Sequence, residues 1–97
     1  MKMWDEMRRL YAATVECDMS KVSISVGGTQ AEWCAIVQKS KEDSSDAFAF
    51  THDNATGAVT GLSCFLVMQA LMKNVPVALI RDFCVELSKH INKLEEP

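Results

Sequence analysis

The stretch from Thr56 to Pro76 is apolar around nearly the whole circumference of the helix that it predicts. Eleven of the sixteen residues from Ala58 to Lys73 are apolar. Gln69 interrupts the run, whereas a helix that spans a bilayer needs about 20 predominantly apolar residues. The run therefore predicts a core helix that other elements must cover on several sides, and we expect no membrane contact.

The sheet can cover one face of such a core helix, and the last helix can cover a second. The remaining flank carries small side chains at Gly57, Thr60, Gly61 and Cys64, which suit a close neighbour. This flank meets either the N-terminal helix or a second copy of the chain, and the pattern leaves both alternatives open.

The length of 97 residues predicts a single domain, residues 1–97, which buries only about two-thirds of its unfolded surface. Association into a homo-oligomer would add to its modest core. The net charge of −3, with basic residues scattered along the chain, argues against direct binding to nucleic acid. Charged residues at positions 5, 6, 8 and 9 interrupt any signal peptide, so a cytoplasmic location is expected.

Hydrophobic periodicity predicts the first helix and three strands. One face of the N-terminal helix is apolar (Met3, Trp4, Met7, Leu10, Tyr11, Thr14, Val15), and the other is charged and expected to be exposed (Lys2, Asp5, Glu6, Arg8, Arg9). Alternation predicts strands over 22–26, 32–38 and 47–51, with Trp33, Ala35 and Val37 on one face of the second. We expect Gly27-Gly28 to form the first hairpin turn and 39–46 to form an exposed loop. The second strand is expected in the middle of the sheet, or covered on both sides.

Two further helices complete the predicted order. Asn74 is suited to a left-handed cap and Pro76 to the first turn of the last helix. The last helix carries an apolar stripe (Ile80, Cys84, Leu87, Ile91, Leu94) that we expect to pack on the sheet. The fold class is therefore α+β, a two-layer αβββαα domain with a three-stranded antiparallel sheet packed by helices.

No motif in the chain indicates catalysis. The four cysteines form no CxxC or CxxH pair and are expected to be buried thiols, without a metal site. His90 follows Cys84 by six residues, so a helix turns the two side chains apart. We therefore expect no enzyme activity, no catalytic residue and no cofactor.

The most polar junction is the sequence His52, Asp53 and Asn54, between a strand and a helix. Such junctions present donors to anions, so these three residues are candidate ligand-binding residues, with Arg81 supplying charge and Trp33 a stacking surface. The alternative is that Asp53 or Asn54 turns the chain and caps the helix that follows.

Residues 66–80 resemble a segment of the TSCPD domain, a small α/β module that is appended to B12-dependent ribonucleotide reductases and also occurs alone. The residues that carry the resemblance are Leu66, Val67, Ala70, Leu71, Val75, Pro76, Val77 and Ile80. They match the helix, the Val-Pro joint and the next helix of that domain.

In size and element order the chain is also similar to small phage and prophage proteins that counter bacterial immunity. Some of these sequester nucleotide signals at subunit interfaces, and others, including an anti-CRISPR class, cover a nuclease surface. The resemblance implies a non-enzymatic binding protein with a small anionic, nucleotide-like ligand at a subunit interface. The alternatives are direct inhibition of a host immune nuclease by protein contact, and an enzyme of unknown chemistry.

Overall fold

The computed structural model describes residues 2–29, 32–39 and 47–94. The order of the main elements is helix, three strands, helix, helix, as predicted. The elements are α1 (Lys2–Val15), η1 (Met19–Lys21), β1 (Val22–Gly28), β2 (Trp33–Lys39), β3 (Phe48–His52), α2 (Ala55–Met72), α3 (Val77–His90) and η3 (Ile91–Lys93). The predicted α+β class is confirmed.

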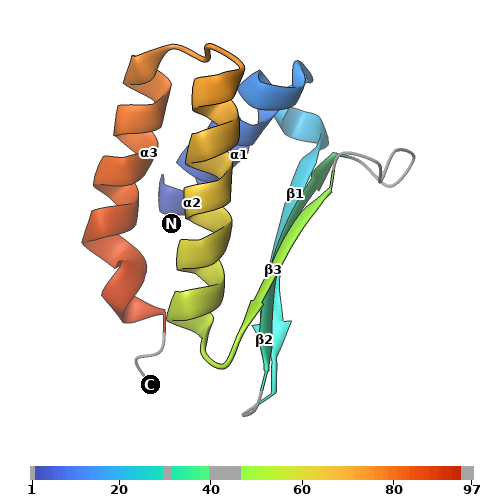
Figure 1. Cartoon of the computed structure of the whole chain (residues 1–97), viewed down its shortest axis with the longest axis vertical. Helices are drawn as coiled ribbons and strands as arrows, with labels where there is room; N and C mark the ends of the chain where they lie inside the picture. The colour runs from blue at the N-terminus through green and yellow to red at the C-terminus, as the bar shows by residue number, and fades with distance from the viewer. Residues whose placement is uncertain (1, 30–31, 40–46, 95–97) are drawn as a thin grey trace.

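The strands form one antiparallel sheet in the order β1-β2-β3, so β2 is the middle strand. Ala35 of β2 pairs with Val26 of β1 and with Phe50 of β3, which places the apolar alternates of all three strands on one face. All three helices lie on that side of the sheet (Figure 1). The opposite face presents small and hydroxyl side chains around Ile36.

The core lies between the sheet and the helices α1 and α2. Its fully buried side chains come from α1 (Met3, Met7, Leu10, Tyr11), β2 (Ala35, Val37), α2 (Ala58, Val59, Leu66, Ala70) and α3 (Phe83). Tyr11 also accepts a hydrogen bond on its hydroxyl oxygen from the Lys39 amide, at 3.1 Å. This contact ties the first helix to the end of the middle strand.

The prediction that the stripe of the last helix packs on the sheet is wrong. Helix α3 packs chiefly against α1, with Ile80 and Phe83 buried and Cys84 exposed. A three-stranded sheet is only about 10 Å wide between its outer strands, and helices pack about 8–10 Å apart, so α1 and α2 already fill its inner face. The third helix therefore packs on the side of α1 that faces away from the sheet.

The first hairpin turn lies later than predicted. Gly27 and Gly28 belong to β1 and pair with Cys34 and Trp33, and neither glycine has a positive φ. The strand continues through both glycines. The hairpin closes beyond them, where the Thr29 amide donates a hydrogen bond to the Glu32 carbonyl at 2.8 Å. Lys39, the first residue of the predicted loop 39–46, belongs to β2, and the remainder of that prediction lies outside the described residues.

Local capping decides both ends of α2. The Asn54 side chain accepts a hydrogen bond from the Gly57 amide at 2.6 Å, and Asn74 has the predicted left-handed conformation with φ of 59°. Only seven of the eighteen α2 residues are buried, although its length and composition alone would let it cross a membrane. The rest of this apolar helix is half-buried or exposed.

Candidate functional site

The polar junction between β3 and α2 is largely occupied by its own hydrogen bonds. Asn54 is the N-cap of α2, which confirms the capping interpretation for this residue. Asp53 Oδ1 lies 2.7 Å from His52 Nδ1 and accepts a hydrogen bond from Asn54 Nδ2 at 2.9 Å. The three residues predicted to bind an anion thus contact one another at the start of the helix.

Two glycines of α2 allow β3 to lie close to the helix. A Cβ atom on Gly57 would collide with the His52 ring, and one on Gly61 would collide with the Phe50 ring. The flank of small residues is therefore partly covered by β3 of the same chain, whereas Thr60 and Cys64 remain exposed. The sequence predicted the N-terminal helix or a second copy at this flank, and neither alternative included β3. The predicted cover of α2 by the last helix is also wrong as the main helix contact, because α1 packs on α2 more extensively than α3 does.

Trp33 and Arg81 lie in different parts of the molecule. Trp33 is half-buried and pairs with His52 across β2 and β3, so it lies at the same end of the sheet as the polar junction. Arg81 is exposed near the start of α3, at the opposite end of the helical layer (Figure 1). The structure brings four of the five predicted site residues together and separates Arg81 from them.

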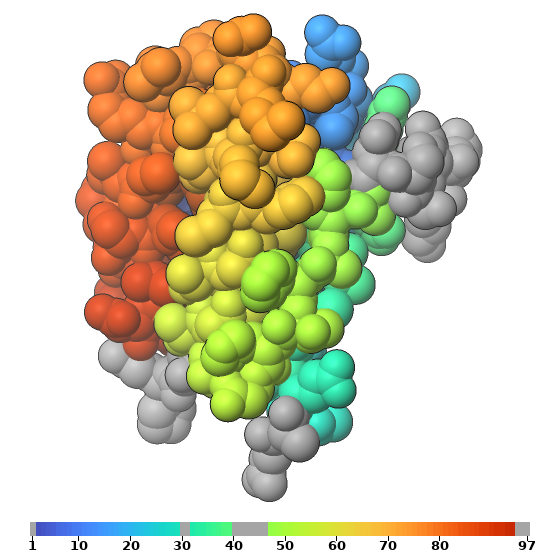
Figure 2. All heavy atoms as spheres, viewed as in Figure 1, coloured from blue at the N-terminus to red at the C-terminus, as the bar shows by residue number. Residues whose placement is uncertain are grey.

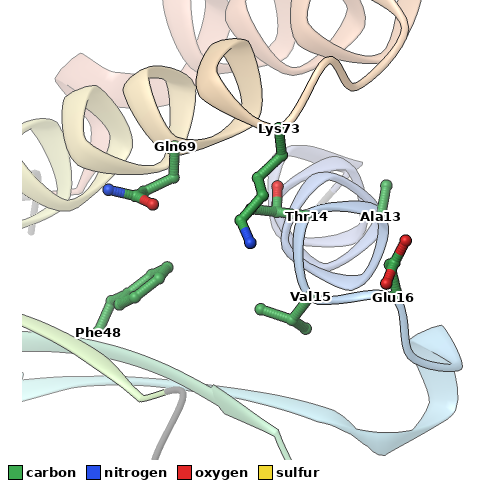
Figure 3. A pocket seen from close by; sticks show the side chains of 7 residues that line it. All are labelled: Ala13, Thr14, Val15, Glu16, Phe48, Gln69 and Lys73. Atoms are coloured by element: carbon green, nitrogen blue, oxygen red, sulfur yellow. The ribbon is translucent and has the colours of Figure 1, made fainter.

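A pocket of about 380 Å³ lies between the end of α1, the start of β3 and the last turns of α2 (Figure 3). Its lining residues are Ala13, Thr14, Val15, Glu16, Phe48, Gln69 and Lys73. The Gln69 and Lys73 side chains point from α2 toward the sheet, and Phe48 stands below them (Figure 3). A cation, an amide and an aromatic ring thus line one small cavity.

The pocket side chains differ in how firmly they are held. The Phe48 ring makes edge contacts with Tyr11 and Phe65, with ring centroids 5.6 and 4.9 Å apart. The Thr14 hydroxyl donates to the Leu10 carbonyl at 2.8 Å. In contrast, Lys73 is exposed and has no ion-pair partner within the described part of the chain. A rigid ring therefore lies beside a cation that is available to a ligand.

The sequence prediction missed this pocket, but a signal for it was present. Gln69 and Lys73 interrupt and end the apolar run, and their spacing of four residues places both on one side of the helix. Two long polar side chains on one side of an apolar helix indicate a site there. The sequence could not place Phe48 and Glu16 in this site, because no local sequence pattern relates them to α2.

A second charged cluster lies between α1 and α3. Glu6, predicted to be exposed, is only 4% exposed, because α3 packs over it. Its Oε1 atom pairs with Arg9 at 2.9 Å, while Glu86 lies 3.6 to 3.8 Å from Lys2, Lys89 and His90. The Lys2–Glu86 pair joins α1 to α3, whereas the other pairs each lie within one helix, and the cluster has a structural role.

The thiols and possible metal ligands give no second site. The prediction of buried thiols is wrong for Cys64 and Cys84, which are exposed because α2 and α3 keep uncovered flanks; Cys17 and Cys34 are half-buried. Within residues 2–29, 32–39 and 47–94, no three His, Cys, Asp or Glu side chains converge as a metal site.

Comparisons with protein-family models, with curated proteins and with solved structures found no match. The pocket and the exposed surfaces are therefore the features that bear on function.

Proposed function

We propose that the chain is a non-enzymatic binding protein that holds a small anionic, nucleotide-like molecule in the pocket between α1, β3 and α2. The observation that carries the proposal is the convergence of Lys73 and Gln69 on the fixed ring of Phe48. The volume of about 380 Å³ is within the range of small-molecule sites.

The lining suggests how such a ligand is oriented. The phosphate group faces the Lys73 ammonium, because a charge-assisted hydrogen bond is stronger than a neutral one. A flat base lies against Phe48, away from the Glu16 carboxylate, which lies on the other side of α1 (Figure 3). Gln69 can both donate and accept, so it contacts the base or the sugar.

Binding without reaction fits the side chains that line the pocket. They include neither a cysteine nor a histidine, and the Thr14 hydroxyl already donates to a backbone carbonyl. A protein with this pocket lowers the free concentration of a nucleotide signal, as the resemblance to phage and prophage anti-defence proteins suggests. No cofactor is needed for this role.

A melting experiment with a panel of mononucleotides and cyclic dinucleotides tests the proposal. A hundredfold excess over the dissociation constant stabilises the native state by about 2.7 kcal/mol, which raises the melting temperature of a chain this short by about 10 °C or more. Lys73→Ala should weaken binding tenfold or more, because it removes a charged hydrogen bond worth about 1.5–3 kcal/mol.

Lys93→Ala is the matched control, because Lys93 is also an exposed lysine but lies in η3, outside the pocket lining. It should bind like the wild type. If no nucleotide raises the melting temperature, or if Lys73→Ala and Lys93→Ala weaken binding equally, the proposal is wrong.

The second candidate function is direct inhibition of a host immune nuclease by protein contact. The observation that favours it is the apolar flank of α2, where Met68, Leu71 and Met72 are 51%, 58% and 70% exposed. An inhibitor of this type should block a purified nuclease in trans, and Met72→Asp should abolish that inhibition while Lys73→Ala leaves it intact.

A further inference from the structure

The exposed flank of α2 continues onto the free edge of β3, and we call this surface the α2–β3 face. It is formed by Phe50, Thr60, Cys64, Met68, Leu71 and Met72, all of which are exposed. Figure 2 looks onto it, with β3 in light green beside α2 in yellow. None of the six residues is charged.

The edge of β3 is open to another strand. Its partner β2 lies on one side, and within the described part of the chain no strand lies on the other. The sequence from Phe48 to His52 contains neither proline nor lysine, residues that commonly block an edge. A shallow apolar groove of about 380 Å³ follows this edge, lined by Ala47, Phe48, Ala49, Phe50, Leu62 and Phe65.

We propose that a second copy of the chain covers the α2–β3 face. The two β3 strands pair antiparallel about a two-fold axis at Phe50, the central residue of the strand, and the two sheets join into one of six strands. Because Phe50 contacts Gly61, the axis crosses α2 near Gly61, so the two α2 helices lie side by side across it, cover Thr60 and Gly61, and bring the two Cys64 thiols near each other.

The spacing of strands and helices supports this arrangement. Helix α2 packs on β2 and β3 to a similar extent, so it lies above the space between them. Neighbouring strands are about 4.8 Å apart, which places the two-fold axis about 2.4 Å outside β3 and about 4.8 Å from α2. The two α2 helices are therefore about 10 Å apart, the distance at which helices pack directly.

The absence of charge also favours an identical partner. A two-fold interface places each patch against a copy of itself, so any charged residue near the axis would meet a like charge. The α2–β3 face avoids this repulsion, because α2 has no charged residue from Ala55 to Met72. It also offers a charged foreign surface no complementary group.

The size of the face sets the expected strength. With the axis near Gly61, residues 55–67 of the two helices face each other over about 20 Å, and one helix and one strand together are about 15 Å wide, so the projected contact is about 300 Å² per copy. This is smaller than a standard interface, so a weak dimer with a dissociation constant in the high micromolar range is expected. The inference does not depend on the ligand pocket, whose lining shares only Phe48 with the edge groove.

The test is the mass of the full chain by light scattering from low to high micromolar concentration. The wild type should change from monomer to dimer, and Thr60→Asp should raise the dimer dissociation constant about a hundredfold or more, because it places a pair of carboxylates beside the two-fold axis. Val85→Asp is the matched control, because Val85 is an apolar residue of α3 that is 45% exposed and lies outside the face. It should dimerise like the wild type.

Two further readouts locate the contact. A short bis-maleimide should link two chains through Cys64 and not through Cys84, although both thiols are exposed, so Cys64→Ser should abolish the link and Cys84→Ser should not. Amide hydrogens of Phe48–His52 should exchange more slowly as dimer forms. A strict monomer at high micromolar concentration, a dimer that only Val85→Asp disrupts, or a face covered by a different protein would overturn the proposal.

Discussion

The contact between Phe50 and Gly61 gives a sharp test of how β3 packs on α2. In a helix interior, Gly→Ala normally stabilises by up to about 1 kcal/mol, because alanine loses less backbone entropy on folding. At Gly61 the new Cβ atom would collide with the Phe50 ring. The ring must move outward, away from the helix.

The magnitude follows from the burial of that ring. Phe50 is 40% exposed, so more than half of its surface is shielded from water in the folded chain. A fully buried phenylalanine contributes about 1.5–3 kcal/mol, and forcing extra atoms into a packed contact costs about 1–3 kcal/mol. After the helix gain is subtracted, Gly61→Ala should destabilise the chain by about 1 kcal/mol.

Removing the ring should reverse the sign. In a Phe50→Ala background the added methyl group meets no ring, so Gly61→Ala should stabilise by about 1 kcal/mol. The coupling between the two substitutions is then about 2 kcal/mol, well above the additivity error of about 0.5 kcal/mol. Gly27→Ala is the control, because nothing lies within 4 Å of a Cβ atom there, and it should not destabilise.

Urea unfolding followed by circular dichroism measures the wild type, the two single variants, the double variant and the Gly27→Ala control, at a concentration where light scattering reports a monomer. Each kcal/mol should also appear as a change of about 4–8 °C in melting temperature. If Gly61→Ala stabilises the wild-type chain, or if its effect is the same with and without Phe50, then β3 does not pack on α2 as described.

Three further stability predictions follow from the hydrogen bonds and ion pairs. Asn54→Ala removes the N-cap of α2 and should lower the free energy of unfolding by about 1 kcal/mol in urea. Tyr11→Phe leaves the Lys39 amide without its side-chain acceptor and should cost about 1 kcal/mol, with no change in the far-ultraviolet spectrum. Glu6→Met should stabilise by about 1 kcal/mol, because Glu6 Oε2 is buried and has no hydrogen-bond partner among the described residues, whereas Arg9→Ala should destabilise by leaving the carboxylate unpaired.

Each of these predictions has a result that would contradict it. An Asp53→Ala chain as unstable as Asn54→Ala would mean that the loss is not specific to the cap, because only Asn54 bonds the helix amide. A Tyr11→Phe chain as stable as the wild type would show that the hydrogen bond to the Tyr11 hydroxyl does not stabilise the fold. A loss of stability in Glu6→Met would show that the buried carboxylate stabilises the contact of α1 with α3.

The sequence predicted secondary structure and helix caps correctly where the signal lies in neighbouring residues. The periods of 2 and 3.6 residues identify the strands and helices, and the residue chemistry of Asn74 identifies the left-handed end of α2. The boundary after β1 was misplaced, because a Gly-Gly pair permits a turn but does not require one when strand pairing can continue through it.

Tertiary structure alone decided which surfaces meet. Periodicity shows that one side of a helix is buried but not what buries it, so Glu6 was predicted to be exposed although α3 covers it. The pocket joins Glu16, Phe48 and Lys73, which are far apart in the sequence, because α1, β3 and α2 converge there. The apolar run of α2 determined that this helix would be central, whereas the width of a three-stranded sheet decided that one of its flanks would stay open.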